Sequence, residues 1–208
     1  MKAKLAIGIP LFAIAISACT GQPSGNNPIS TGDSTAPATS ARPSILVAVP
    51  AAPPQVGRAG TRAGYDPCFE IGDGPVSELG FEASSRVRSD FIYDDYAWIG
   101  CKFERREKSR VTGNDIPGGW MIISSTDLSL DKFWQRSDFS SKQAITVNGR
   151  EALSYMPEFK DRCSIAMKGP DGVISVDLHN AKGLSDWDGC DHIQEAAEKI
   201  ESALPRMK

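Results

Sequence analysis

The chain has 208 residues and carries 23 basic against 26 acidic side chains, a formal net charge of −3 at pH 7. These charges are unevenly divided, because residues 1–64 hold five of the basic side chains and one of the acidic ones. The rest of the chain therefore carries 18 basic and 25 acidic side chains, a net charge of −7. A region this acidic lacks the electrostatic footprint of a nucleic-acid-binding protein, which excludes that class of partner.

The first 18 residues have the anatomy of a secretory signal peptide, with a basic start and an apolar centre from Leu5 to Ile16. As a helix this centre would span about 18 Å, which is too short for a hydrocarbon core of roughly 30 Å. It ends in Ile16-Ser17-Ala18-Cys19, a lipobox. The sequence predicts cleavage before Cys19 and lipidation of its thiol. The alternative is an ordinary signal peptide followed by a chance cysteine.

Residues 19–64 are expected to form a disordered tether, because they are rich in Pro, Ser, Thr and Gly and contain no aromatic residue. A flexible coil of about 45 residues has a root-mean-square span of roughly 35 to 40 Å. The β-prone run from Ile45 to Val49 leaves two readings open. It either docks on a sheet edge or stays an unstructured apolar patch.

Residues 65–208 form one domain that is long enough to bury a single core. Besides Cys19 the chain contains four cysteines: Cys68, Cys101, Cys163 and Cys190. In an exported chain an even number of cysteines implies disulfides, and four allow three connectivities. We favour the sequential pairing, because it joins each end of the domain to a neighbouring strand. A zinc site is not expected, since no two cysteines are close in sequence and only His179 and His192 are available.

Hydrophobic periodicity and turn signals predict strands and short helices in the domain. The segment from Asp66 to Cys68 is expected to be a turn. Asn148-Gly149 lies between two apolar runs and predicts a type I′ hairpin, because both residues tolerate a positive φ. The expected elements are: a helix at 75–80, strands at 97–104 and 120–125, a helix at 130–134, a hairpin at 144–155, and strands at 163–167 and 174–178.

The last element is an amphipathic helix at 191–204, in which Asp191 and Gln194 form a capping box and Pro205 ends the helix. A helix with one apolar stripe must pack against another surface. We therefore predict an α+β fold, in which an antiparallel β-sheet packs against this C-terminal helix and two disulfides staple the domain.

No catalytic motif is recognised, and we predict neither enzymatic activity nor a cofactor. The chain contains no Gly-x-Ser-x-Gly elbow, no phosphate-binding glycine-rich loop and no His-Glu-x-x-His motif. The segment 186–191 is similar to a calcium loop, but its glycine falls too early and Ala197 stands where a bidentate glutamate belongs. No metal site is therefore expected.

Two surface segments are candidates for binding. The first combines aromatic and acidic residues, which suit an amphipathic contact: Tyr93, Asp94, Asp95 and Tyr96. Its alternative reading is a loop that covers the core. The second is a basic run that is either a solvated strand end or a contact for an anionic partner: Lys102, Arg105, Arg106, Lys108 and Arg110.

Five features follow one another in a set order along the chain: Asp66-Pro67-Cys68, the strand of Cys101, the segment from Val147 to Ala152, the strand of Cys163, and Cys190 before the terminal helix. In this order they resemble the actinobacterial lipoproteins of the domain of unknown function 3558 family. Residues 65–208, the lipobox and the tether all take part in this resemblance. One departure is Phe103, which stands where a tryptophan is expected. A more distant likeness, to the sheet-and-helix layout of PsbP and Mog1 proteins, rests on topology alone.

The family name implies no activity, so two functional classes stay open. The first is a non-catalytic lipoprotein, anchored to the lipid bilayer through Cys19 on the extracytoplasmic face of the cell membrane, that binds an envelope protein, glycan or lipid. The second is an envelope hydrolase with a site built from scattered acids and histidines. A binder needs an exposed apolar groove, whereas a hydrolase needs convergent titratable groups in a cleft. We favour the binder.

Overall fold

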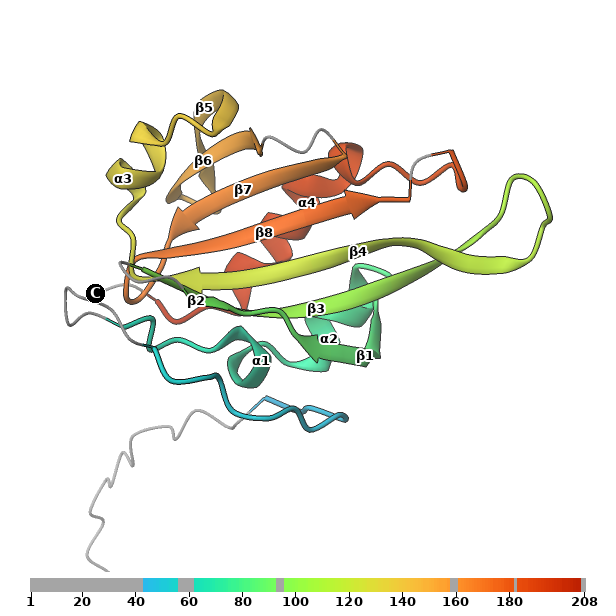
Figure 1. The fold of residues 1–208 in the computed structure, drawn as a ribbon, viewed down its shortest axis with the longest axis horizontal. Coiled ribbons are helices and arrows are strands. Elements are labelled where there is room, and N and C mark those ends of the chain that lie inside the picture. Colours follow the sequence, from blue (N-terminus) through green and yellow to red (C-terminus); the bar gives the residue numbers. More distant parts are fainter. Residues whose placement is uncertain (1–42, 56–61, 93–95, 158–160, 182, 207–208) are drawn as a thin grey trace, which may run out of the picture. The chain divides into compact units, whose positions relative to one another are not determined.

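The computed structural model describes residues 43–55, 62–92, 96–157, 161–181 and 183–206. Within these ranges the strands form one antiparallel sheet, and the chain ends in a helix that packs against it (Figure 1). The predicted α+β class is therefore confirmed in its main features, although most of the structure is sheet. The predicted signal peptide, Cys19 and much of the predicted tether lie outside the described residues.

The sheet has the strand order β1-β3-β4-β8-β7-β6-β5, and β2 pairs with β3 off this path. All neighbouring strands are antiparallel. The pairing of β4 with β8 joins the first half of the domain to the second. The strands are: β1 Glu82–Arg88, β2 Phe91–Ile92, β3 Ala97–Lys108, β4 Asp115–Thr126, β5 Phe139–Val147, β6 Arg150–Pro157, β7 Arg162–Lys168 and β8 Val173–Asn180.

The helices divide between the two faces of the sheet. Helices α1, α2 and α4 contribute to the main core on one face, which we call the covered face. Helix α3 packs on one end of the opposite face, which we call the open face. In Figure 1, α4 lies behind the strands and α3 stands at the edge near β5 and β6. The helices are: α1 Pro67–Glu70, α2 Asp73–Glu78, α3 Leu130–Gln135 and α4 Gly189–Ser202.

The main core lies between the covered face and α4. Met121 and Ile123 of β4 and Val176 and Leu178 of β8 are buried there, at alternate positions of their strands. Alternation places every second side chain of a strand on the same face, so one parity of each central strand is apolar. The helix supplies its own apolar stripe: Ala196, Ala197 and Ile200. Fully burying a large apolar side chain, such as that of Ile123 or Leu178, stabilises the fold by about 1.5 to 3 kcal/mol.

Helix α4 begins at Gly189, so the predicted cap at Asp191 is wrong. The N-cap is Asp188, whose side chain accepts a hydrogen bond from the backbone N–H two residues later at 2.8 Å. The side-chain amide of Asn180, at the end of β8, donates to Asp188 at 2.8 Å and accepts from the backbone N–H of Gly189 at 2.6 Å. Since either aspartate is a good local cap, this contact from the sheet decides where the helix starts.

The sequence reasoning missed α1, β1 and β2 at the start of the domain. Asp66 accepts a hydrogen bond from the backbone N–H of Cys68 at 3.0 Å, so the expected turn is the capped start of a one-turn helix. Strand β1 lacks a clear apolar alternation because Arg86 occupies one of its buried positions, with a relative exposure of 1%. A charged residue at a core position removes the periodic signal by which a strand is recognised.

The predicted sequential pairing of the cysteines is confirmed, as Cys68–Cys101 and Cys163–Cys190. The first disulfide joins α1 to β3 with Cα atoms 5.0 Å apart, and the second joins β7 to α4 with Cα atoms 5.2 Å apart. The two pairs are separated by 33 and 27 residues in sequence. In the chain-entropy model, loops of this length stabilise the fold by roughly 3 to 4 kcal/mol each.

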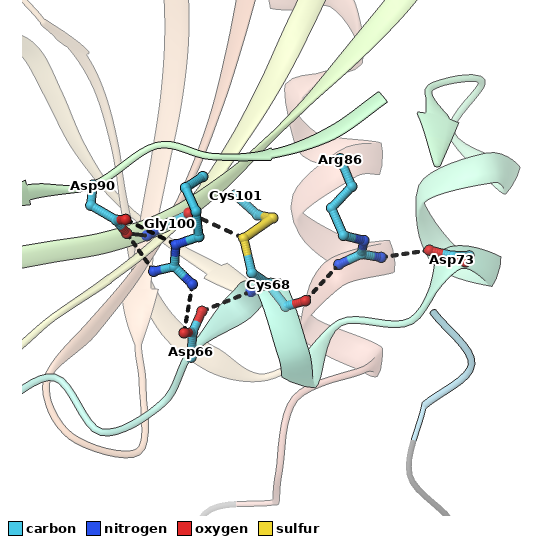
Figure 2. The surroundings of a disulfide bond; sticks show 8 residues. Asp66, Cys68, Asp73, Arg86, Asp90, Gly100 and Cys101 are labelled. Atoms are coloured by element: carbon cyan, nitrogen blue, oxygen red, sulfur yellow. Dashed lines mark hydrogen bonds and ion pairs between the residues drawn. A yellow bond between two sulfur atoms is a disulfide. The ribbon is translucent and has the colours of Figure 1, made fainter. Parts of the chain in front are cut away.

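Ion pairs surround the first disulfide (Figure 2). The guanidinium of Arg86, whose side chain is 0% exposed, donates to Asp73 at 2.6 Å and to the carbonyl oxygen of Cys68 at 3.0 Å. Asp66 lies on the other side of the disulfide and accepts a hydrogen bond from the guanidinium of Arg88 at 2.6 Å. Charged hydrogen bonds as well as the disulfide therefore tie α1 and α2 to strands β1 and β3.

The run from Ile45 to Val49 is docked against α2, not against a sheet edge. The carboxylate of Asp73 accepts a hydrogen bond from the backbone N–H of Leu46 at 2.6 Å, through the oxygen that Arg86 does not use. The backbone N–H of Asp73 in turn donates to the carbonyl oxygen of Ser44 at 2.9 Å. Val49 packs against the main core. This part of the predicted tether therefore contacts the domain.

The hairpin of β5 and β6 has the predicted turn, with φ of 50° at Asn148 and 84° at Gly149. Its tip also holds the end of α4. The side-chain amide of Asn148 donates to the carbonyl oxygen of Glu198 at 2.9 Å, and the buried guanidinium of Arg150 donates to Glu201 at 2.8 Å. The turn residues are therefore part of the packing between the sheet and its C-terminal helix.

The buried pair of Arg86 and Asp73 yields a stability prediction. Asp73→Asn leaves a buried guanidinium without its counter-charge, so the free energy of unfolding should fall by about 3 to 5 kcal/mol. Urea unfolding at pH 7, followed by tryptophan fluorescence, measures the change. The matched control is Glu78→Gln, which breaks an exposed pair with Lys199 and should lower the free energy of unfolding by less than about 1 kcal/mol. Equal losses in both variants would contradict the assignment.

Candidate functional site

Strand β8 presents polar side chains on the open face and apolar side chains on the covered face. On β8, the apolar residues at 174, 176 and 178 alternate with Ser175, Asp177 and His179. Strand pairing places Ile122 of β4 opposite Asp177. Helix α3 covers one end of this face through Phe133, which is 0% exposed in a second, smaller core. The polar residues of β8 continue beyond this smaller core.

A cavity of about 350 Å³ lies on the open face beside the end of α3. This volume is at the lower end of the roughly 300 to 1,000 Å³ that small-molecule sites occupy. Aromatic side chains from several strands form most of its wall: Phe91, Tyr96, Trp98, Phe139 and Tyr155. Other lining residues supply charged or hydroxyl groups: Ser124, Arg136, Asp138, Arg162 and Asp177.

Arg136 lies against the aromatic wall in a fixed orientation. Its guanidinium donates two hydrogen bonds to Asp138, at 3.0 and 2.7 Å. It also lies 4.9 Å from the ring centre of Phe139 and 5.5 Å from that of Tyr96. The hydrogen bond between them raises the pKa of Arg136 and lowers the pKa of Asp138. Both groups are therefore charged at neutral pH, and together they are electrically neutral.

Asp177 lies at the floor of the cavity within a hydrogen-bond network. Ser164 donates to one carboxylate oxygen, and Ser175 donates to the other at 3.0 Å. Ser175 uses its hydroxyl hydrogen in the bond to Asp177. The Tyr155 hydroxyl, whose oxygen lies 3.1 Å from that of Ser175, is therefore the donor in the bond between these two residues. Burial raises the pKa of Asp177, while the bond from Ser164 and the charge of Arg162 oppose the shift. The pKa of Tyr155 is also raised, mainly by burial and to a lesser extent by the charge of Asp177.

His179 stacks on Trp120 beside the cavity, with ring centres 4.9 Å apart and planes inclined by 21°. The ammonium of Lys102 lies 5.3 Å from the ring centre of Trp120. Burial lowers the pKa of His179 to about 4, and the charges of Arg162 and Lys102 act in the same direction. Within the described part of the chain, the buried Nε2 atom of His179 has no hydrogen-bond partner. The imidazole is therefore neutral at neutral pH.

The predicted binding surface is described only in part. Tyr93, Asp94 and Asp95 lie outside the described residues. Tyr96 lines the cavity, where its ring contacts the guanidinium of Arg136. The lipidation site, Cys19, also lies outside the described residues.

The sequence reasoning missed the cavity residues of the second half of the domain, above all Arg136 and Asp177. A signal for Asp177 was present, because Ser175, Asp177 and His179 fall at every second position of a predicted strand. Polar residues at that spacing indicate a strand with one polar face. No comparable signal identifies Arg136, which enters the cavity from the segment that follows α3.

The two other candidate segments have local structural roles. Much of the basic run is paired with acids, so it is not an unopposed cationic patch: Arg105 with Glu107, Lys108 with Asp115, and Arg110 with Asp186. In the segment that is similar to a calcium loop, Asp188 caps α4. Within the described ranges, no three acids, histidines or cysteines are grouped as a metal site. No helix in these ranges is both long and apolar enough to span a bilayer.

The cavity is suited to non-covalent binding. Aromatic faces offer apolar contact area, and fixed polar groups can orient a ligand. The hydroxyls nearest Asp177 belong to Ser164 and Ser175, whose residues are 2% and 0% exposed. Hydroxyls buried this deeply are poorly accessible to a substrate, and their hydrogen bonds fix the orientation of the Asp177 carboxylate.

The pKa of His179 gives a prediction for the pH dependence of stability. The unfolded chain protonates this histidine below about pH 6.5, whereas the folded protein does so only near pH 4. The unfolded state therefore binds more protons between these values, and the stability of the wild type should fall as the pH is lowered through this window. His179→Gln should remove this component.

Urea unfolding of the wild type and of His179→Gln between pH 7 and pH 4 tests the expectation. The difference in unfolding free energy between the two proteins should shrink as the pH falls. His192→Gln is the matched control, because this second imidazole is half exposed. A constant difference between the wild type and His179→Gln across the window would contradict the prediction.

Comparison with known proteins supports the family suggested by the sequence features. No curated protein matches the chain, and no solved structure matches it. A family described as "Protein of unknown function (DUF3558)" matches residues 14–203, which include nearly all of the described domain. The chain therefore belongs to the DUF3558 family of proteins of unknown function.

Proposed function

We propose that this protein is a non-catalytic binding module of the cell envelope, anchored to the membrane by lipid on Cys19. The domain would hold a small ligand in the aromatic cavity on its open face. The observation that carries the proposal is this cavity of about 350 Å³, which combines aromatic walls with fixed charged groups. Cavities of this kind are the usual sites of small-molecule binding in proteins.

Two features support an extracytoplasmic location. The N-terminal sequence combines a basic start, an apolar stretch and a lipobox, as lipoprotein precursors do. The domain also contains two disulfides, which form and persist mainly in oxidising compartments. We further propose an actinobacterial origin and a layout like that of PsbP and Mog1, from the resemblance and the topology respectively.

An envelope hydrolase is the second candidate function. Its supporting observation is that Asp177, Tyr155 and His179, all of which have shifted pKa values, lie in or beside one cavity. Shifted groups of this kind often occur at catalytic sites. We favour the binder, because both oxygens of Asp177 already accept hydrogen bonds from buried serines. A structural network can produce the same shifts through burial.

The lipid anchor can be tested directly. Cys19→Ser removes the thiol that receives the lipid, so this variant should incorporate no fatty-acid probe during metabolic labelling and should leave the membrane fraction. The wild type should be labelled and should sediment with membranes. Secretion of the variant with intact disulfides, shown by non-reducing peptide mapping, confirms that it folds. Labelling of Cys19→Ser equal to that of the wild type would contradict the assignment.

The cavity can be tested by native mass spectrometry of the full chain purified from its own envelope. The wild type should carry a bound small molecule. Ile122→Trp places a larger ring in the cavity and should abolish this adduct. The matched control is Ile116→Trp, the same substitution on the same strand but outside the cavity lining. An adduct that persists in Ile122→Trp, or a wild type without an adduct, would contradict the proposal.

A further inference from the structure

We propose that the ligand of the cavity is an uncharged, mainly apolar molecule, which the aromatic rings hold through apolar and stacking contact. This inference rests on the proposed binding function and specifies the class of ligand. Two observations support it. The rings of the walls are fixed by one another, which favours an apolar body. The charged groups of the lining are bound within the protein, which disfavours a charge on that body.

The aromatic walls belong to one cluster of rings. Phe133, which is fully buried, contacts Trp98 with ring centres 5.2 Å apart and Phe139 with ring centres 5.6 Å apart. The ring of Phe139 in turn lies 4.3 Å from that of Tyr155, measured between ring centres. Trp98, Phe139 and Tyr155 all line the cavity. Rings held by their neighbours lose little freedom when a ligand packs against them, so the walls are preorganised for an apolar body.

Phe91 and Ile122 extend the apolar surface of the lining. Phe91 lies on the two-residue strand β2 and is 57% exposed although it lines the cavity. Ile122 lines the same cavity from β4. An apolar ligand in contact with these side chains would remove their surface from water, which is the main favourable contribution to apolar binding.

Arg136 and Asp138 neutralise each other at the aromatic wall. Two hydrogen bonds, at 3.0 and 2.7 Å, join the guanidinium to the carboxylate. The guanidinium also lies against the rings of Tyr96 and Phe139. An anionic ligand would have to compete with Asp138 for Arg136, and a cationic ligand would have to compete with Arg136 for Asp138. Each charge of this pair therefore already has its counter-charge.

The other two charged residues of the lining are also bound within the protein. Asp177 accepts a hydrogen bond from Ser164 at one carboxylate oxygen and from Ser175 at the other. Burial raises the pKa of Asp177, which weakens it as a counter-charge for a cation. Arg162 has an interaction of its own within the protein, and its charge acts on Asp177. A charged ligand group would therefore lose its hydration without gaining a free counter-charge from the described part of the lining.

Competition among three naphthalene compounds of different charge can test this inference. The compounds share one ring system: 1-naphthalenemethanol is uncharged, 1-naphthoate is an anion and 1-naphthylmethylammonium is a cation. Each is titrated against the neutral fluorescent dye N-phenyl-1-naphthylamine on the full chain with Cys19→Ser, which carries no lipid that could bind the dye. Only the dye signal that Ile122→Trp removes is counted, because this signal reports the cavity. The alcohol should displace the dye at a concentration about tenfold lower than either charged compound.

Separating the pair of Arg136 and Asp138 should change this preference in a defined direction. Asp138→Asn leaves the guanidinium without its counter-charge, so displacement by the naphthoate should strengthen about tenfold relative to the alcohol. Arg136→Gln leaves the carboxylate alone, so the ammonium should gain in the same way. The dye signal itself shows that each variant is folded. The matched control is Asp186→Asn, which breaks the exposed pair with Arg110 outside the cavity and should leave the order of the three compounds unchanged.

The outcomes separate the class of ligand from the binding function. If a charged compound displaces the dye as well as the alcohol does, or if neither variant of the pair shifts the order, the uncharged class is wrong and the binding cavity stands. If Ile122→Trp leaves the dye signal intact, the cavity does not take an apolar molecule and this inference fails. The adduct in native mass spectrometry then decides the binding function alone.

Discussion

Both disulfides join a helix to the same face of the sheet, and this constraint leaves the opposite face for the cavity. Cys101 of β3 and Cys163 of β7 have the strand parity of the covered face, and their partners lie on α1 and α4. The two bonds therefore hold these helices against that face in the oxidised protein. Only the short helix α3 packs on the opposite face within the described residues, which leaves space there for the cavity.

The motifs behind the family resemblance have structural roles in this fold. Asp66 caps α1 and bonds to Arg88, while Asn148 and Arg150 hold the end of α4 through a glutamate and a backbone carbonyl. None of these side chains lines the aromatic cavity. Membership of the family therefore predicts the architecture of the domain, whereas the class of ligand has to be argued from the cavity of this chain.

The elements that the sequence predicts well are those with a local cause. Asn148-Gly149 requires a specific turn, and an apolar stripe requires a helix to pack on a surface. Strand β1 is missed because a buried Arg86 interrupts the apolar pattern, and its charge is balanced by Asp73, which is distant in sequence. The cavity is missed for a similar reason. Tyr96, Arg136 and the β8 residues come together only when β4 pairs with β8, which no local pattern specifies.

Ser164, Ser175 and Asp177 form a polar floor beneath the cavity, and these groups bear on function because stability alone does not account for them. Burial raises the pKa of Asp177, so the carboxylate is harder to ionise in the folded protein than in the unfolded chain. This difference lowers the free energy of unfolding at neutral pH. Apolar residues in place of Ser164, Ser175 and Asp177 would simply extend the smaller core around Phe133. Polar groups that break such a local rule are expected mainly at functional sites. Both acids of the lining are already hydrogen-bonded by the protein, so these polar groups are held in place beside the aromatic walls.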